Sequence, residues 1–391
     1  MPGPHVLLID DDPLVLRAVR RALRHTRPDW AVVVASTPAE VFVALSTRAA
    51  DVVVSDVQVG THDGLALLSE LGRRWPDMLR VVFTASEEAC GDPEMSAVAH
   101  RIVSKETDPR ALLATIEDAL TARAWISSEE LRRIVFGARD LPSAPEIAPK
   151  LRMIARDPTA RVRDLADVVA RDPAVSARVL RIASSVFYGG GRRIKTLEEA
   201  VARLGVRTLQ ALVLDAEIAK RFSVPTASGI TAEQLARHSF QVARIALRIG
   251  QDVAPELAET AYFAGVVHDV GQLVLADRDP ARLAQDRRLA ERSGQPLDVV
   301  EAERHGNTHA TVGAALLHLW SFERSLVEGV ADHHRAPSER PAGIDVGTIL
   351  WMAQAAARSP EEALPEVAVE VAALGWGTRF SLWRDDLTSI A

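Results

Sequence analysis

Three carboxylates follow two short apolar runs near the N-terminus and could share a cation. Asp10 and Asp11 come directly after the run 6–9, and Asp56 closely follows the run 52–54. In an open parallel sheet, functional groups gather beyond the carboxyl ends of the strands, where the winding direction reverses. Three carboxylates there repel one another, and Mg²⁺ would relieve this repulsion because it prefers oxygen ligands. An Asp56 oxygen would then be able to attack a phosphoryl donor.

Two more polar residues end later apolar runs of the same segment. Thr84 follows the run 81–83, and Lys105 comes shortly after the run 102–103. A hydroxyl and an ammonium at that edge could contact the oxygens of an aspartyl phosphate, the ammonium through charge-assisted hydrogen bonds. The alternative is that strand-end acids only cap the helices that follow them. We favour the shared site, because five suitable groups lie on four strands in the required order.

The segment from residue 6 to about 123 predicts the sheet that would position these groups. Its short apolar runs alternate with amphipathic stretches, and the runs are 6–9, 32–34, 52–54, 81–83 and 102–103. Between the first two runs, Leu16, Val19 and Leu23 recur at helical spacing, and 111–120 predicts a closing helix. The alternation predicts an α/β domain with a doubly wound, five-stranded parallel sheet in a flavodoxin-like order.

Residues 4 to about 123 resemble the receiver domain of response regulators. The matching positions are 9–11, Asp56, 63–64, 84–85 and Lys105. The resemblance implies that a sensor histidine kinase phosphorylates Asp56 and that Thr84 and Lys105 act as switch groups. It also implies that Mg²⁺ is bound by Asp10, Asp11, Asp56 and the backbone carbonyl of Gln58.

Three positions depart from the receiver pattern. Val59-Gly60 stands where Met-Pro is usual, Glu106 replaces the proline after the lysine, and Ile102 takes the place of an aromatic residue that normally reports the switch. None of these changes removes a ligand or the phosphoacceptor. The change at Ile102 leaves open how the signal leaves the pocket.

Long helical patterns replace the short apolar runs in the second half of the chain. Thr196 with Glu199 and Thr231 with Gln234 fit capping boxes, in which a hydroxyl and a later acid or amide satisfy free backbone donors. The second half is therefore predicted to be all helix. We expect a receiver domain at 1–123, a helical linker at 124–140, a helical domain at 141–358 and a C-terminal extension at 359–391.

Five histidines of the helical half are separated by roughly helix-length intervals and could converge on one pocket: His238, His268, His309, His333 and His334. His268 is followed by Asp269, and an imidazole and a carboxylate at consecutive positions can both reach a metal ion. Since Cys90 is the only cysteine, metal chemistry here must use His, Asp and Glu. The alternative is that each histidine is an isolated, hydrogen-bonded residue.

Residues 141 to about 358 resemble the HDOD domain, a regulatory relative of the HD phosphohydrolases. The matching positions are 141–145, 172–173, 184–189, 198–205, 309–313, Trp320 and 333–334. The resemblance implies protein interaction in a regulatory pathway, with a target that it does not name. The chain also keeps the histidines of cyclic-dinucleotide phosphodiesterases of the HD-GYP type. The implied site for iron, manganese or zinc is His238, His268, Asp269, His309, His333 and His334.

Two substitutions weigh against hydrolysis. Gln272 stands where the enzymes have a lysine that would face a substrate phosphate, and Gln354 aligns with an aspartate that closes the metal site. An amide is a poorer ligand for a transition metal than a carboxylate. Because hydrolysis needs a metal-activated water and charge on the phosphate, the sequence favours a regulatory protein over an enzyme.

Three functions follow. We favour a response regulator whose phosphorylation on Asp56 controls an HDOD domain that acts on a protein partner. The second is a metal-dependent phosphohydrolase of a cyclic dinucleotide or nucleotide. The third is a DNA-binding regulator, since 197–214 superficially resembles a helix-turn-helix. A net charge of -7 argues against DNA as a partner, and the short arginine clusters at 20–21, 192–193 and 287–288 are interpreted as solvated surface.

The sequence also sets expectations for location and assembly. No segment approaches the roughly 18 uninterrupted apolar residues of a membrane span, and the N-terminus carries no basic stretch followed by an apolar run. A cytoplasmic protein without membrane contact is therefore expected. Association into a homodimer stays open.

Overall fold

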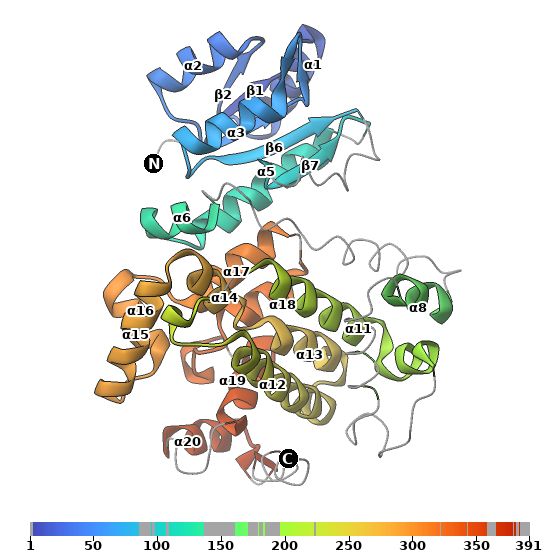
Figure 1. Cartoon of the computed structure of the whole chain (residues 1–391), viewed down its shortest axis with the longest axis vertical. Coiled ribbons are helices and arrows are strands. Elements are labelled where there is room, and N and C mark those ends of the chain that lie inside the picture. The colour runs from blue at the N-terminus through green and yellow to red at the C-terminus, as the bar shows by residue number, and fades with distance from the viewer. Residues whose placement is uncertain are drawn as a thin grey trace. The chain divides into compact units, whose positions relative to one another are not determined.

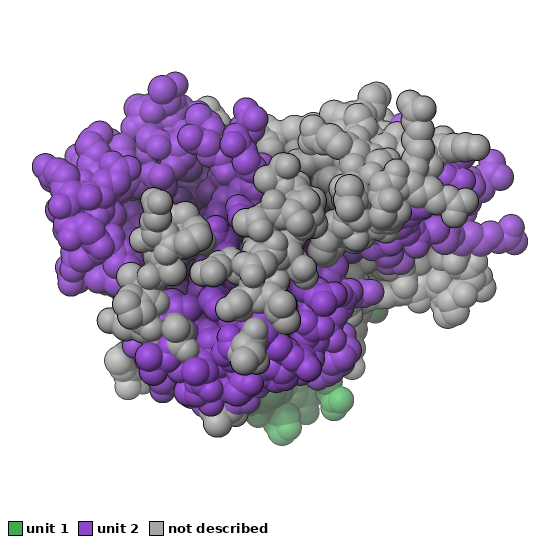
Figure 2. Space-filling view, turned by 90° about the horizontal axis from the view of Figure 1, so that it is seen from below, with its two compact units in different colours: residues 1–144, 315–321 green, residues 145–314, 322–391 purple. Residues whose placement is uncertain are grey.

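The structure is a computed structural model of the whole chain (Figure 1). It describes residues 3–85, 95, 98–106, 109–136, 161–170, 179, 183, 196–222, 224–320, 322–341, 343–357, 365–377, 379–380 and 383. Cys90 and the expected HDOD motifs at 141–145, 172–173 and 184–189 lie outside these residues. The chain forms two compact units, residues 1–144 with 315–321 and residues 145–314 with 322–391, which Figure 2 colours separately.

The first unit contains the predicted five-stranded parallel sheet. Its strands are β1 (His5–Ile9), β2 (Ala31–Ala35), β3 (Val52–Ser55), β6 (Leu79–Thr84) and β7 (Arg101–Ser104). Their order is β2-β1-β3-β6-β7, and every neighbouring pair is parallel. The predicted fold class is therefore confirmed, with strands slightly longer than the apolar runs. Ile9 pairs with Ser55, so the residues that follow them, Asp10 and Asp56, leave the sheet side by side.

Helices cover both faces of this sheet. They are α1 (Pro13–Thr26), α2 (Pro38–Thr47), α3 (Gly64–Arg74) and α5 (Pro109–Ala124). Leu7 and Val53 pack with α2 and α3 residues in one core cluster. Their sequence neighbours Val6 and Val52 are fully buried as well, as a strand covered on both faces requires. Continuous apolar runs marked these strands because neither face meets water.

A short hairpin at the end of the sheet was not predicted. Strands β4 (Gln58–Val59) and β5 (His62–Asp63) pair antiparallel across a turn that contains Gly60. Gly60 has a φ of 61°, a left-handed conformation that favours glycine. This turn accounts for the glycine at a position where the receiver pattern has proline, since proline cannot adopt a positive φ.

Helix α6 (Glu129–Phe136) ends the first part of the described chain and is the expected connecting helix. Its C-terminal carbonyl, Phe136 O, accepts hydrogen bonds from Arg80 Nη2 at 3.2 Å and from His100 Nε2 at 3.1 Å. The Arg80 backbone N–H donates to His100 Nδ1 at 2.8 Å. Arg80 is only 2% exposed, so its guanidinium is buried against backbone carbonyls. Burial lowers the pKa of Arg80 to about 10.

The described part of the second unit is helical, as predicted. Its α-helices are α8 (Val162–Ala170), α11 (Leu197–Arg221), α12 (Ala232–Val253), α13 (Ala258–Val267), α14 (Val270–Arg278), α15 (Pro280–Ser293), α16 (Leu297–His305), α18 (Arg324–Ala331), α19 (Val346–Ala357) and α20 (Pro365–Ala373). It also contains residues 309–314 of α17 (His309–Leu319), the rest of which is assigned to the first unit. Short 3₁₀ turns lie at Thr226–Ser228, Pro255–Leu257 and Pro337–Glu339. The capping box of Thr231 with Gln234 is present at the start of α12.

Every residue of helix α13 except Glu259 is buried, and α11, α12, α18 and α19 contact it. A Cβ on Gly265 would lie 2.6 Å from Ala243 Cα, so glycine lets α13 approach α12 closely. Helix α11 is interrupted at Gly205, whose φ is 74°. Within the described residues, no helix combines the length and the apolar character needed to cross a bilayer.

Candidate functional site

The first unit gathers the predicted carboxylates beyond the ends of β1 and β3. Ligand oxygens of Asp10, Asp11 and Asp56 all lie within 4.8 Å of one another. Asp10 is buried, Asp56 is half-buried and Asp11 is exposed. The Asp12 backbone N–H donates to Asp10 Oδ1 at 2.9 Å, and the Val57 backbone N–H donates to Asp56 Oδ1 at 2.7 Å. Backbone hydrogen bonds therefore orient one oxygen of Asp10 and one of Asp56.

Lys105 lies between two of these carboxylates. Its Nζ donates to Asp10 Oδ2 at 2.7 Å and to Asp56 Oδ2 at 2.6 Å. Burial alone would lower the pKa of Lys105, but the hydrogen bonds to Asp10 and Asp56 outweigh burial and raise it. The lysine therefore stays an ammonium. Its backbone N–H donates to Thr84 O at 2.6 Å, which places buried Thr84 beside it at the same edge of the sheet.

A close backbone contact supports the segment directly after β3 that carries Asp56. The Gly64 backbone N–H donates to Val57 O at 2.8 Å. A Cβ on Gly64 would lie 2.0 Å from Asp56 O, so any larger residue would displace the Asp56 backbone. The neighbouring Asp63 caps α3, its Oδ1 accepting from the Leu65 and Ala66 backbone N–H groups. Asp63 is therefore a helix-capping residue, whereas the Asp56 carboxylate contacts Lys105.

The chemistry of this pocket fits a hard divalent cation. It offers three carboxylates, and one ammonium meets only two of them. Mg²⁺ takes oxygen ligands and commonly binds one or two carboxylates together with waters. Asp10, Asp11 and Asp56 would hold it, and Gln58, which opens the β4–β5 hairpin, is the expected source of a backbone carbonyl.

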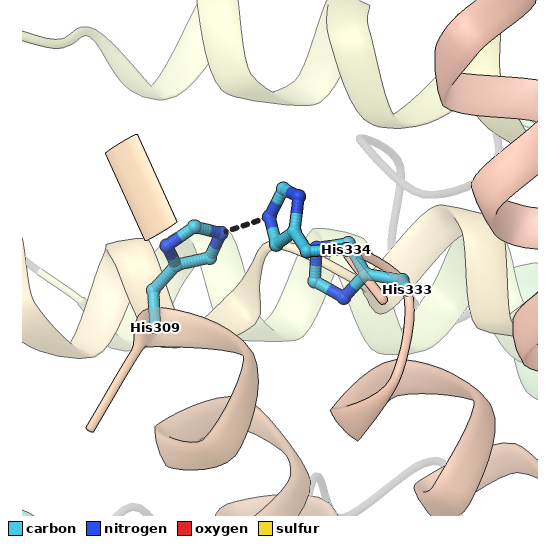
Figure 3. Close-up of side chains that lie close together, drawn as sticks. All are labelled: His309, His333 and His334. Atoms are coloured by element: carbon cyan, nitrogen blue, oxygen red, sulfur yellow. Dashed lines mark hydrogen bonds between the residues drawn. The ribbon is translucent and has the colours of Figure 1, made fainter. Parts of the chain in front are cut away.

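The second unit brings together all six of its predicted ligands. His238 lies on α12, and His268 with Asp269 occupies the junction between α13 and α14. His309 begins α17, and His333 with His334 follows α18. Ligand atoms of His238, His268 and Asp269 lie within 4.8 Å of one another, as do those of His309, His333 and His334. Figure 3 shows the second group, with the two Nε2 atoms of His309 and His334 2.9 Å apart.

Asp269 belongs to the first group and also contacts two histidines of the second. Its Oδ2 is 3.3 Å from His268 Nε2 and 3.9 Å from His238 Nε2. Its Oδ1 is 3.3 Å from His309 Nε2 and 4.0 Å from His333 Nε2. The side chain makes no capping bond to α14 although Asp269 occupies the N-cap position. Its two carboxylate oxygens therefore contact imidazoles and not the backbone of α14.

The ring nitrogens of His268 and His333 test whether a metal fits here. His268 Nδ1 is 2.8 Å from Gly265 O and His333 Nδ1 is 2.5 Å from Val330 O, so each Nδ1 carries the proton. In the neutral ring Nε2 then presents a lone pair. Both Nε2 atoms are buried and form no hydrogen bond with any described residue. Lone pairs that face a buried carboxylate need a cation between them, so the site fits a metal ion.

The pKa directions of His333 and His334 agree with this arrangement. Burial raises the pKa of Asp269, but His268 and His309 outweigh it and hold that pKa well below the usual value. Burial lowers the pKa of His333 and of His334 well below the usual value, and neighbouring histidines add to the effect. Neutral imidazole is the form that binds metals.

Glu301 on α16 is a site residue that sequence reasoning missed. Its side chain is fully buried, and its Oε2 accepts from the backbone N–H of His309 at 2.8 Å. The same oxygen lies 2.7 Å from His309 Nδ1. Burial lowers the pKa of His309, but Glu301 and then Asp269 outweigh burial and raise it well above the usual value. A carboxylate that orients a ligand histidine is common around metals. Nothing in its polar helix distinguishes Glu301 from a surface residue.

The two glutamines that replace charged residues are both buried. Gln272 lies one turn after Asp269, and its Oε1 accepts from Arg287 Nη1 at 3.3 Å. The sequence indicates solvated surface for the arginine pair 287–288, but Arg287 is half-buried and contacts Gln272, while Arg288 is exposed. Gln354 lies on α19, and its Nε2 has no hydrogen-bond partner among the described residues.

A glycine contact holds two of the ligand-bearing elements together. A Cβ on Gly271 would lie 1.9 Å from His309 O and 2.8 Å from Gly313 N. The start of α14 therefore packs directly on the first turn of α17. This contact places Asp269 and His309 within reach of each other.

Family models and related sequences agree with this architecture. The HDOD domain model matches residues 141–336, and the response regulator receiver domain model matches residues 6–117. An uncharacterized protein of Treponema pallidum (strain Nichols) is 23% identical over 199 residues, 51% of this chain and 38% of that protein. The transcriptional regulatory protein GlrR of Escherichia coli (strain K12) is 31% identical over 135 residues, 34% of this chain and 29% of that protein. The chain thus spans well under half of either relative.

Solved structures match the helical fold. An HDOD domain protein of unknown function from Geobacter sulfurreducens is 21% identical, with a TM-score of 0.53 over 71% of this chain and 99% of that one. A candidate phosphohydrolase from Shewanella amazonensis SB2B is 26% identical, with a TM-score of 0.53 over 67% of this chain and 94% of that one. A receiver sheet followed by an HD-related helical domain defines a two-component response regulator. The chain belongs to the HDOD family and carries a response regulator receiver domain at its N-terminus.

Proposed function

We propose that a sensor histidine kinase transfers a phosphoryl group to Asp56 and that the aspartyl phosphate controls the HDOD domain. The observation that carries this proposal is the contact of Asp56 Oδ2 with Lys105 Nζ at 2.6 Å, beside the oxygens of Asp10 and Asp11. Asp10, Asp11, Asp56 and the Gln58 carbonyl would hold Mg²⁺, which would supply positive charge beside the phosphoryl group. Lys105 donates to phosphoryl oxygens, and Thr84 responds to them.

The HDOD domain acts as the output through a protein partner whose contact surface changes with phosphorylation. Phosphorylation biases the receiver between two states, and differential contacts of the two states transmit the change. Asp56 is the residue whose modification starts this sequence of events. The expected result is a phosphorylation-dependent change in the hydrogen exchange of second-unit amides.

Labelling with acetyl phosphate and Mg²⁺ tests the proposal. The full chain should gain one phosphoryl group by intact mass, and Asp56→Asn should gain none because an amide cannot accept it. Asp29→Asn, a change at an exposed aspartate, is the matched control and should label like the parent chain. Equal labelling of Asp56→Asn and the parent would refute the assignment. Beryllofluoride should reproduce the hydrogen-exchange change in the parent and not in Asp56→Asn.

A second candidate function is metal-dependent phosphohydrolysis of a cyclic dinucleotide or nucleotide. The observation that favours it is the pair of buried Nε2 atoms, of His268 and His333, that face Asp269 without a proton donor among the described residues. The similarity to a candidate phosphohydrolase at 26% identity supports it as well. Iron, manganese or zinc held by His238, His268, Asp269, His309, His333 and His334 would supply an activated water.

Metal analysis and a turnover assay separate the two candidates. The enzyme requires stoichiometric metal together with hydrolysis that His268→Gln abolishes, while His25→Gln on the exposed surface of α1 changes neither. Bound metal without turnover leaves the regulatory proposal as the function. Protein that is free of metal after purification and after incubation with each of the three metals would eliminate both the enzyme and the metal site.

A further inference from the structure

The second unit contains a solvent-open surface pocket, called the cavity below, whose lining includes none of the candidate metal ligands. Its volume is about 510 Å³, and it is lined by Gln285, Arg288, Leu289, Glu291, Arg292 and Arg304. Five of these residues belong to α15, and Arg304 belongs to α16, which lies beside α15 (Figure 1). The volume is within the range of small-molecule sites, roughly 300–1,000 Å³.

Positive charge dominates this cavity. Three arginines line it against a single carboxylate, that of Glu291. Arg288 and Arg292 are exposed and lie one helical turn apart on α15. Neither has a hydrogen bond or an ion pair with any residue that the structure describes. Their guanidinium groups are therefore available to an anion.

A buried carboxylate holds the third arginine in place. Asp286 on α15 is fully buried, and Arg304 Nη1 donates to its Oδ1. His305 Nε2 lies 3.0 Å from Asp286 Oδ2, and Arg282 Nε lies 3.8 Å from the same oxygen. Since several groups share Asp286, its charge does not neutralise the cavity. The contact joins α15 to α16 and fixes Arg304 at the cavity wall.

We propose that this cavity binds a phosphate-bearing small molecule of about nucleotide size. Guanidinium groups match phosphate in geometry and charge through paired N–H donors. Leu289 and the methylene stems of Arg288 and Arg292 provide an apolar wall for a base or sugar ring. A volume of about 510 Å³ matches a molecule of nucleotide size, and five of the six lining residues are exposed, so a ligand can reach the guanidinium groups directly from solvent.

The position of the cavity connects it to the candidate metal centre. Helix α16 carries Arg304 at the cavity and, one turn earlier, Glu301, which accepts from His309 N and lies 2.7 Å from His309 Nδ1. A ligand that contacts Arg304 therefore contacts the helix that orients His309. The binding itself depends neither on phosphorylation of Asp56 nor on a metal.

Isothermal titration calorimetry of the full chain with inorganic pyrophosphate and with ADP tests the proposal. EDTA is present, so that metal-bound phosphate at other sites makes no contribution. The double variant Arg288→Gln/Arg292→Gln should bind each probe at least about tenfold more weakly, because it loses two charge-assisted contacts. The matched control Arg21→Gln/Arg24→Gln removes two exposed arginines of α1 and should leave the affinity unchanged. Both double variants remove exposed side chains, and circular dichroism with a urea transition verifies their folding.

Weakening that is confined to the α15 variant, and that disappears as salt is raised, supports the site. Absence of binding of both probes to the parent chain at millimolar concentration overturns it. Equal affinity of the two double variants also overturns it, because the anion would then bind elsewhere. If a polyglutamate peptide binds more tightly than pyrophosphate or ADP, the proposed class of ligand is wrong.

Discussion

Lys105 Nζ lies 2.6 Å from Asp56 Oδ2 and 2.7 Å from Asp10 Oδ2, so one ammonium is shared by two carboxylates beyond adjacent strands. The side chains of Lys105, Asp10 and Asp56 are 19%, 4% and 19% exposed, which limits the screening of this contact by water. In the structure the lysine pairs with two of the three carboxylates that Mg²⁺ would bind. Lys105 therefore stabilises the pocket before any cation or phosphoryl group arrives.

Replacing Lys105 by methionine should destabilise the first unit in a way that depends on Mg²⁺. In EDTA, Lys105→Met should lower the free energy of unfolding by about 2 kcal/mol, because two carboxylates lose their shared cation. Saturating Mg²⁺ should recover much of this loss. Urea denaturation in EDTA and in Mg²⁺ measures both values. Arg27→Met, which breaks an exposed ion pair with Glu117, is the control and should change less than about 1 kcal/mol in either buffer. An equal loss of unfolding free energy with and without Mg²⁺ would contradict the idea that Lys105 and Mg²⁺ neutralise the same carboxylates.

The docking of α6 should weaken in acid because of His100. Burial lowers the pKa of His100 well below 6.5, and the charge of Arg80 adds to this effect. The imidazole accepts from the Arg80 N–H at Nδ1 and donates to Phe136 O from Nε2, so protonation at Nδ1 would place two donors face to face. Arg80 and Arg101 are the charged groups that act on it.

The direction of this pH dependence follows from proton binding by His100. Near and below pH 6.5 the unfolded chain takes up a proton that folded His100 excludes, so the free energy of unfolding falls as the pH drops. The slope from this single group is at most about 1.4 kcal/mol per pH unit. Hydrogen exchange of the amides 129–136, together with urea denaturation from about pH 7.5 to 5.5, measures it. His100→Gln should flatten the pH dependence of the free energy of unfolding, because an amide does not take up a proton in this range. The amide can still donate to Phe136 O, so the docking of α6 is kept. An unchanged slope in this variant would show that another group is responsible.

Most of the first unit could be predicted because its strands are buried on both faces. Val52 and Val53 are both fully buried, and such strands appear in the sequence as continuous apolar runs. The polar residues after each run then fall at one edge of the sheet. The hairpin at Gln58–Asp63 escaped prediction because two-residue strands have no periodicity. Arg80 escaped as well, since nothing in its sequence neighbourhood indicates a guanidinium buried on backbone carbonyls.

In the helical unit, residue type predicted the candidate metal ligands but not the residues that position them. Histidines and an adjacent aspartate are rare enough to suggest a common pocket, and the structure brings all six together. Glu301 looks like any acid of a solvated helix, and only its burial against His309 reveals its role. Arg287 looked like surface for the same reason. Such positioning residues depend on how helices pack, and a single sequence does not encode that in any local pattern.

The packing of α14 on α17 should control metal affinity through Gly271. A Cβ at this position would lie 1.9 Å from the backbone oxygen of His309, so Gly271→Ala must drive the two helices apart. Asp269 and His309 would then separate, which weakens a site that needs both. The free energy of unfolding should fall by roughly 1–3 kcal/mol, as for other overpacked cores. Gly377→Ala is the matched control, because its Cβ would meet Ala372 at an ordinary 3.6 Å. Metal content after dialysis against equimolar Zn²⁺ or Mn²⁺ should drop in Gly271→Ala and stay unchanged in Gly377→Ala. A variant that is destabilised but retains full metal content would show that the site does not depend on this contact.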